Sequence, residues 1–456
     1  MERVGDWRGA PPSIAAPDRG QLMAPPGTMA RQGRRRECAG GAARVDTSTL
    51  EARYRPRAQR EGTALCLSGG GFRAALFHAG AIRRLNELGL LAGVRTVSSV
   101  SGGSIASALL ATVWPRLERD GPCFTNLEAL FERPLRAFCG RNIRNRPLLW
   151  GRLNPRNWPR LASPSFSATD LLAAEYERLV GSVRLSALPP HPRFVFCAAN
   201  LQTGVSFELS SSSIGDYVLG YSEPGQFTLA EAVAASSSFP FAFPPLVRTL
   251  DLDAFVGGDP RAVAVGFRPG PRIALTDGGV YDNMGLEPAW KTHQVVLVSD
   301  GGTPFEIQAR TRTWLVPRLQ RSFQVVVNQA LAVRKRWLVA AYLRGVYRGA
   351  YWGLGTDRDE YQPPGAGRPP GYSGRVLDRL RRVRTDLDCF SPGEQSVLMN
   401  HGWALAGAAL GRWGADLTRP GAQAVAPDPA LFDPDAALAA LGESDRFRLL
   451  GRPPQH

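Results

Sequence analysis

The strongest chemical signal in the sequence is one serine between small residues, where a strand is expected to turn into a helix. The motif Ser-Val-Ser-Gly-Gly at 99–103 ends the apolar run 94–100 and precedes a helix expected over 105–117. This order is the pattern of a nucleophile elbow, a sharp turn that lifts a serine hydroxyl clear of the sheet. The pattern predicts Ser101 as a nucleophile. Ser99 stands where the usual motif has its first glycine, so the match is imperfect.

A glycine-rich loop precedes this motif by about 30 residues. Ser-Gly-Gly-Gly-Phe-Arg at 68–73 follows the apolar strand 63–67 and opens a helix expected over 72–89. Amides at a helix N-terminus favour negative charge, so the loop suits an oxyanion hole, in which each donor is worth roughly 3 kcal/mol. A dinucleotide fingerprint also fits the glycine spacing. That site needs an acidic residue at the end of the second strand, where Ser101 stands instead. A purely structural glycine turn is the third reading.

A late Asp-Gly-Gly motif supplies a candidate carboxylate. Asp277 follows the predicted strand 273–276, and active sites of α/β proteins gather at the carboxyl ends of strands. An Asp-Gly pair is also common in turns, and this motif taken alone would be explained better as a turn than as a catalytic site. Asp300 begins a second Asp-Gly-Gly motif and is a rival for the same role.

A serine nucleophile needs a base within hydrogen-bonding reach. The five histidines are His78, His191, His293, His401 and His456. Only His293 lies near a late loop, and it begins a buried strand, so a triad with histidine stays open but is poorly placed. We expect His78 to be a packed or capping residue. An aspartate that acts directly as the base is the simpler arrangement, provided that a partly dry site adjusts its pKa.

The elements that position these residues alternate between strand and helix, which predicts an α/β fold with a mainly parallel sheet. Further strands are expected at 193–200, with 205–209 as its neighbour, and at 294–299. An inserted hairpin is expected over 250–270, and helices are expected at 229–235, 315–344 and 391–413.

The predicted organisation has four parts. Residues 1–60 are a disordered tail rich in Arg, Pro and Gly, and 63–304 form the catalytic domain. A helical C-terminal extension over 305–417 packs on that domain, and 418–456 form a Pro- and Ala-rich tail.

The net charge of +15 comes almost entirely from arginine, because the chain has only two lysines. The arginine excess is explained by a GC-rich coding genome, and it is also compatible with attraction to an anionic surface such as phospholipid headgroups. The region 315–344 mixes arginines with apolar residues and suits either a helix that covers the sheet or one that lies on a membrane. No nucleic-acid recognition motif is present, so we expect no nucleic-acid partner.

The spacing of the cysteines and the lengths of the apolar runs allow predictions about the cellular compartment and about metal binding. The six cysteines form no Cys-x-x-Cys pair, which predicts no metal site and a reducing compartment, and Cys66 and Cys197 should be buried. No signal peptide is visible, and 97–114 reads as strand, turn and buried helix. We therefore expect a cytoplasmic protein, with peripheral contact at the inner membrane face left open.

Taken in order, the three motifs resemble those of the patatin-like phospholipases, and the chain looks like a bacterial member. The blocks 235–245, with its Ala-Ser and Phe-Pro pairs, and 280–285 resemble segments of that family on either side of the aspartate. The resemblance spans about 63–302 and implies a three-layer α/β/α patatin-like fold. Cytosolic group IV phospholipases have a similar glycine loop.

The resemblance implies a role for each matching residue. Ser101 would be the nucleophile and Asp277 its base, without metal or cofactor. The amides of Gly69, Gly70, Gly71 and Phe72 would form the oxyanion hole, and Arg73 would stabilise substrate phosphate unless it forms an ordinary salt bridge. Supporting positions are Ser99, Gly102, Gly103, Gly278, Gly279 and Asn283.

The implied activity is hydrolysis of lipid esters through an acyl-enzyme, as in a phospholipase A, lysophospholipase or esterase that degrades lipid. The alternative is a catalytically silent membrane-surface binding or regulatory protein on the same fold. Intact Ser101, Asp277 and glycine loop favour the enzyme. Headgroup, acyl-chain and positional specificity and the oligomeric state stay open.

Overall fold

The computed structural model describes residues 61–442 except 151–152, 162, 164–165, 265, 268–269, 303, 306, 312–313 and 363–368. The chain divides into two units, Met1–Arg55 and Pro56–His456, and every described residue belongs to the second. The predicted tail at 1–60 and the end of the predicted tail at 418–456 lie outside the described residues.

Five parallel strands form the centre of a ten-stranded sheet, in the order β12-β11-β1-β2-β5. Their bounds are β1 Thr63–Leu67, β2 Val94–Ser99, β5 Arg193–Asn200, β11 Val295–Asp300 and β12 Arg348–Gly353. Antiparallel strands extend the sheet beyond β5, namely β6 Ser206–Ser210, β7 Ile214–Asp216 and β8 Gly220–Ser222. The mainly parallel sheet and the predicted neighbour of 193–200 are therefore confirmed.

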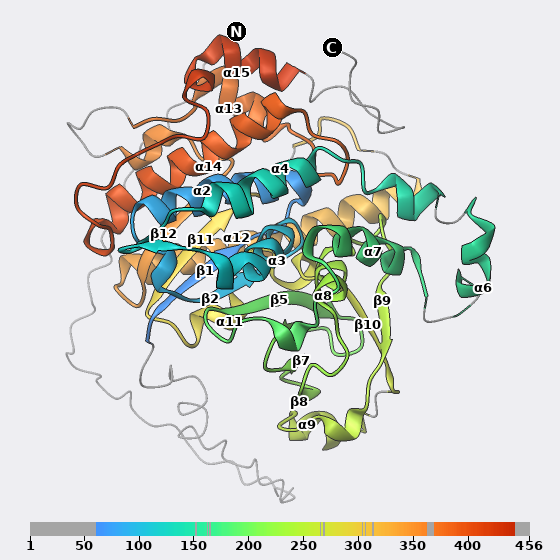
Figure 1. Cartoon of the computed structure of the whole chain (residues 1–456). Coiled ribbons are helices and arrows are strands. Elements are labelled where there is room, and N and C mark those ends of the chain that lie inside the picture. The colour runs from blue at the N-terminus through green and yellow to red at the C-terminus, as the bar shows by residue number, and fades with distance from the viewer. Residues whose placement is uncertain are drawn as a thin grey trace, which may run out of the picture. The chain divides into compact units, whose positions relative to one another are not determined.

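Alternate residues of β1 show that both faces of the sheet are buried. Leu65 and Leu67 belong to the main hydrophobic core, whereas Ala64 and Cys66 belong to a second core on the other face. Successive strand residues point to opposite faces, so the sheet lies between two helical layers. This arrangement confirms the three-layer α/β/α fold (Figure 1).

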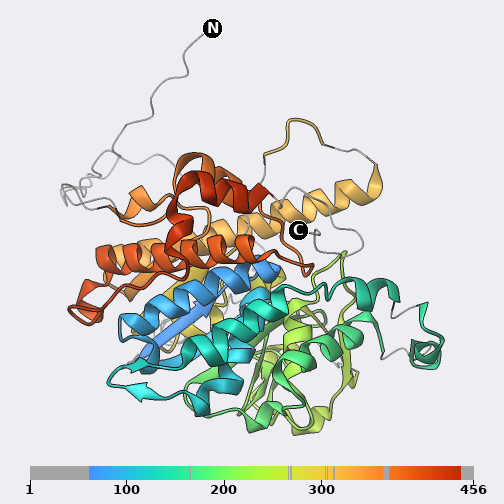
Figure 2. The same ribbon diagram turned by 45° about the horizontal axis from the view of Figure 1, so that its top comes forward.

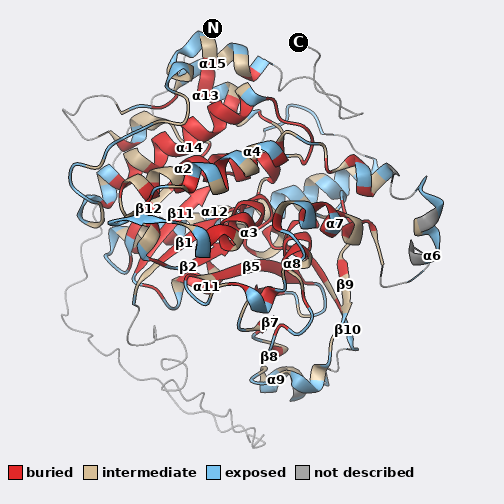
Figure 3. Ribbon diagram, viewed as in Figure 1, coloured by how far each residue is buried: buried red, intermediate tan, exposed pale blue. Residues whose placement is uncertain are grey.

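The main core is covered by helices whose apolar residues face the sheet: α2 Gly71–Glu87, α3 Gly102–Val113, α7 Ala168–Val180, α8 Leu229–Ser237 and α14 Pro392–Trp413. The helix predicted over 391–413 begins as expected. Ser391 accepts from the Glu394 N–H and Glu394 accepts from the Ser391 N–H, a reciprocal capping box. Figure 3 shows how the red, buried residues gather where these helices meet the sheet.

Strand β10 (Arg272–Asp277) brings the late motif to the end of β2. One edge of β5 pairs with β6, so the other edge carries both β2, as far as Phe196, and then β10, at Ala198 to Asn200. Strand β10 runs antiparallel to β5 and therefore takes over the edge of β5 that β2 leaves.

A hairpin surrounds the predicted stretch, but its strands lie outside the predicted bounds 250–270. Its strands are β9 (Leu246–Thr249) and β10, and the stretch between them holds a 3-10 turn, Leu252–Ala254, and helix α9, Pro260–Ala264. The stretch is rich in Asp, Gly and Pro, which disfavour strands, and Pro260 suits a first helical turn instead.

The second helical layer is dominated by α12, Leu315–Leu343, which packs Leu338 and Ala341 into the second core. Figure 2 shows α12, in gold, as one long helix running across the molecule. Further along the chain, α13 (Gly374–Arg381) and α15 (Pro434–Leu441) follow, and α15 buries Ala437 and Leu441. Part of the segment predicted as a tail at 418–456 is thus packed. Among the described helices, none has the length and apolar character needed to cross a bilayer.

Candidate active site

Ser101 occupies a strained turn between β2 and α3. Its φ of 49° is positive, which is uncommon for a residue with a side chain, and its ψ is −114°. The Ser101 N–H donates to the Ser236 hydroxyl at 3.0 Å, and Ser101 is only 9% exposed. The surrounding structure therefore holds the serine in the sharp turn that its sequence context predicts.

The elbow tolerates Ser99 because its side chain has polar partners within the sheet. The Ser99 hydroxyl donates to the Val195 carbonyl at 3.3 Å and accepts from the Ser104 hydroxyl at 3.1 Å. The tight contact lies after the serine instead: a Cβ on Gly102 would stand 2.1 Å from the Gly71 carbonyl oxygen. The elbow and the glycine loop therefore meet backbone to backbone, and the Gly103 N–H donates to the Ser68 carbonyl at 3.1 Å.

Two backbone N–H groups of the glycine loop bond to other segments of the protein, and two face the cavity. The Gly69 N–H donates to the Asn283 carbonyl at 3.0 Å, and the Phe72 N–H donates to the Asp386 carbonyl at 2.9 Å. Within the described part of the chain, the Gly70 and Gly71 N–H groups have no hydrogen-bond acceptor, and both residues line the cavity described below. Of the four predicted donors, these two are positioned to meet a ligand.

The structure does not support the predicted contact of Arg73 with substrate phosphate. Arg73 is fully buried and lies outside the cavity wall. Its guanidinium donates to the Gly301 carbonyl at 3.0 and 3.3 Å and to the Val383 carbonyl at 2.8 Å. It clamps backbone carbonyls from two distant segments instead of forming the ordinary salt bridge considered as its alternative.

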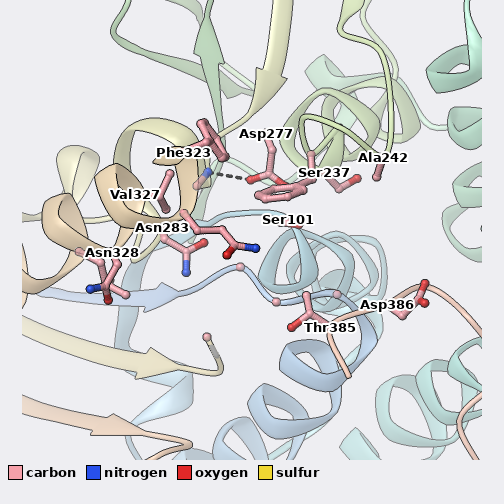
Figure 4. A pocket seen from close by; sticks show the side chains of 18 of the residues that line it. Ser101, Ser237, Ala242, Asp277, Asn283, Phe323, Val327, Asn328, Thr385 and Asp386 are labelled. Atoms are coloured by element: carbon pink, nitrogen blue, oxygen red, sulfur yellow. Dashed lines mark hydrogen bonds between the residues drawn. The ribbon is translucent and has the colours of Figure 1, made fainter. Parts of the chain in front are cut away.

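Asp277 ends β10 beside the elbow. Its Oδ1 accepts the Gly279 N–H at 2.7 Å, and the Gly278 N–H donates to the Ser236 carbonyl at 3.3 Å. Burial raises the pKa of Asp277 from 3.8 to about 7, while hydrogen bonds from Gly279 and from the Ser101 side chain act in the opposite direction. Figure 4 shows Asp277 close to Ser101.

The rival groups lie elsewhere. Asp300 accepts from the Tyr351 hydroxyl at 2.7 Å and from the Gly302 N–H at 3.0 Å, and it does not line the cavity. None of the four histidines in the described range lines the cavity either. His78 is buried between the Ser299 hydroxyl, at 2.8 Å, and the Ser68 carbonyl, at 2.9 Å, as expected for a packed residue. Burial lowers the pKa of His78 to about 4.

A buried carboxylate fixes the loop after Asp277. Asp282 accepts the N–H groups of Met284, Leu286 and Glu287 at 3.2, 2.6 and 3.0 Å. This loop contains Asn283, whose backbone carbonyl accepts the Gly69 N–H and whose side chain lines the cavity. Asn283 thus connects the loop of Asp277 to the glycine loop.

Ser101 and Asp277 open into a cavity of about 450 Å³, the size of a small-ligand pocket. Its wall is largely apolar, and the apolar side chains come from four segments distant in sequence. Its apolar lining residues include Phe239, Ala242, Phe243, Phe305, Phe323, Val327, Leu331 and Leu387. An ion pair between Arg144 and Asp386 also borders it. Helix α12 supplies much of one wall (Figure 4), which sequence reasoning had assigned only to covering the sheet or a membrane.

Two supporting residues were missed by the sequence analysis. Ser236 accepts from Ser101, donates to the Cys197 carbonyl at 2.7 Å and lies 2.8 Å from the Ser104 hydroxyl. The sequence feature that could have pointed to Ser236 is the run of three serines within 235–245. Asp282 carried no signal beyond its place five residues after Asp277.

Comparison with known proteins gives a family. Residues 65–290 match the model of the patatin-like phospholipase family. No curated protein matches the chain. Among solved structures, human GIVD cytosolic phospholipase A2 aligns with a TM-score of 0.45 and 14% identity, over 84% of this chain and 60% of that chain. VipD from Legionella pneumophila aligns with a TM-score of 0.29 and 13% identity, over 76% of this chain and 66% of that chain. This chain thus spans less than two thirds of either protein. Residues 65–290 are thus a domain of the patatin-like phospholipase family.

Proposed function

We propose that this protein is a serine-dependent lipid acyl hydrolase in which Ser101 and Asp277 form a catalytic dyad. Family membership supports lipid acyl hydrolysis as the general activity. The observation that carries the dyad is the meeting of a strained serine and a carboxylate of raised pKa at the wall of one apolar cavity.

In the first step, the Ser101 Oγ attacks the ester carbonyl while Asp277 takes the hydroxyl proton. The Gly70 and Gly71 N–H groups donate to the oxyanion of the tetrahedral intermediate. When this intermediate collapses, the alcohol leaves with the proton from Asp277, and the acyl group remains on Ser101. Asp277 next takes a proton from water, hydroxide attacks the acyl-enzyme, and Ser101 leaves with that proton as the fatty acid is released.

The environment of Asp277 suits it to this role without histidine. A carboxylate of pKa 3.8 is a weak base toward a serine hydroxyl, whereas a pKa of about 7 combines ionisation at neutral pH with greater basicity. The apolar wall accounts for both features, because it desolvates Asp277 and accommodates an acyl chain. We place the ester substrate in a lipid surface and expect peripheral membrane contact.

The test is ester hydrolysis by the full chain and three variants. Fatty-acid or alcohol release is measured on p-nitrophenyl esters and on mixed phospholipid vesicles for wild type, Ser101→Ala, Asp277→Asn and Asp300→Asn. We expect the first two substitutions to lower kcat by at least about a thousandfold and Asp300→Asn, the matched control, to retain most activity. Inert wild type on every ester, or full activity of folded Ser101→Ala, would contradict the proposal and favour a binding protein.

A further inference from the structure

One face of α12 carries an exposed apolar stripe. Its members are Leu315, Leu319, Val326, Val333 and Trp337, which are 58, 52, 66, 50 and 43% exposed. The Trp337 ring at one end of the stripe also packs against Trp290, with ring centres 4.6 Å apart. At 3.6 residues per turn, these five positions fall within about 40° of one another around the helix axis. A coherent apolar face on a helix requires a partner, unlike scattered apolar residues on a surface.

The adjoining flank of α12, which begins about 40° further round the helix, already has its partners. Phe323, Val327 and Leu331 line the cavity, and Leu338 and Ala341 enter the second core. Phe323 also packs edge-on against Phe239 and Phe241, with ring centres 6.0 and 5.6 Å apart. The exposed stripe is therefore an additional surface on a helix that is anchored by the flank next to it.

The charge of α12 indicates the partner. The 29-residue helix contains Arg318, Arg321, Arg334, Lys335 and Arg336 and no acidic residue. Arg318 and Arg336 are exposed and lie about 60° to one side of the stripe. Neither pairs with a carboxylate in the part of the chain that the structure describes.

We propose that the α12 stripe docks on an anionic lipid bilayer, with Leu319 and Val326 in the acyl boundary and Arg318 and Arg336 at the phosphates. A second copy of the chain is a poor occupant, because pairing two stripes would bring their flanking arginines together. Nucleic acid phosphates would pair with Arg318 and Arg336, but they would not cover the apolar residues of the stripe. Docking would bring the α12 wall of the cavity to the surface that holds the substrate. The link between docking and access to substrate rests on the proposed function as a lipid acyl hydrolase.

Vesicle flotation of the full chain tests the surface, in a Ser101→Ala background so that lipids stay intact. The vesicles are phosphatidylcholine alone or an equal mixture with phosphatidylglycerol. We expect flotation with the mixture, a partition coefficient at least about tenfold lower for Leu319→Ser/Val326→Ser, and a loss on the order of tenfold for Arg318→Gln/Arg336→Gln. The matched control, Val256→Ser/Val425→Ser, removes two exposed valines outside α12 and should float like the parent.

Absence of flotation with the mixed vesicles, or an equal loss in the valine control, would overturn the proposal. So would light scattering that shows a dimer which Leu319→Ser/Val326→Ser disperses, because the stripe would then join two copies. Hydrolysis of a soluble ester by the otherwise wild-type chain with Leu319→Ser/Val326→Ser separates the two proposals, and we expect it to be unchanged. If wild type hydrolyses no ester but flotation still depends on the stripe, docking stands and the enzymatic proposal falls.

Discussion

Replacement of Asp277 by asparagine should stabilise the fold at neutral and alkaline pH while removing activity. Burial raises the pKa of Asp277 from 3.8 to about 7, so the folded protein favours the protonated carboxyl. Each pKa unit corresponds to about 1.4 kcal/mol, and the shift therefore amounts to about 4 kcal/mol at most. Asparagine has the same shape and no charge, and its carbonyl can still accept the Gly279 N–H.

The pH dependence fixes the sign of this effect. With a folded-state pKa above the unfolded one, the protonated carboxyl contributes stability that is complete below about pH 4 and is lost as pH rises through about 7. Wild type and Asp277→Asn should then have similar free energies of unfolding near pH 4. The variant should be more stable by about 2–4 kcal/mol above pH 7.

Urea unfolding at about pH 4, 6 and 8 measures this difference, with Ser101→Ala as a control that keeps the carboxylate. We expect the gap between Asp277→Asn and wild type to widen with pH, and the gap for Ser101→Ala to vary much less. A gap that is constant with pH, or one in which wild type is more stable at pH 8, would refute the view that Asp277 is held in a costly environment for function.

Three further predictions concern the same site. First, kcat/KM on a soluble ester should rise with pH around a midpoint near 7, because deprotonated Asp277 is the base; a flat profile between about pH 5 and 9 would contradict this. Second, Gly102→Ala should cost roughly 2 kcal/mol or more of stability and most activity, because its methyl group would stand 2.1 Å from the Gly71 carbonyl oxygen. Gly93→Ala, which meets nothing within 4 Å, should have little effect on either urea unfolding or turnover. Third, Arg73→Lys should destabilise the fold by roughly 1–3 kcal/mol, since buried carbonyls lose donors, without changing the ratio of activities on phosphate-bearing and phosphate-free esters. A selective loss on phospholipids would restore a role in phosphate binding.

Local patterns predicted much of this fold. The apolar strands 63–67 and 94–100, each followed by glycine and helix, indicated the parallel sheet and placed Ser101 at a turn. The structure brings the glycine loop, Ser101 and Asp277 to one cavity, as their order along the chain suggested. These features were accessible because each depends on residues adjacent in sequence.

Long-range features were not accessible in this way. Asp277 was expected at the carboxyl end of a strand, and it does end β10. The sequence did not indicate that β10 runs antiparallel to β5 and reaches the site along the edge that β2 leaves. Arg73 resembled a ligand in sequence because its acceptors, the carbonyls of Gly301 and Val383, lie more than 200 residues away. The cavity wall formed by α12 depends on where this helix packs relative to distant segments, and the spacing of apolar residues within 315–343 does not reveal that.

The most direct test of the central claim is covalent labelling by a lipid-like fluorophosphonate, which reacts with activated serines, followed over pH. We predict a single adduct on Ser101, located by peptide mass spectrometry, with a labelling rate that rises around pH 7 and falls at least about a hundredfold in Asp277→Asn. Labelling at another serine, or unchanged labelling of Ser101 in Asp277→Asn, would contradict the proposed dyad.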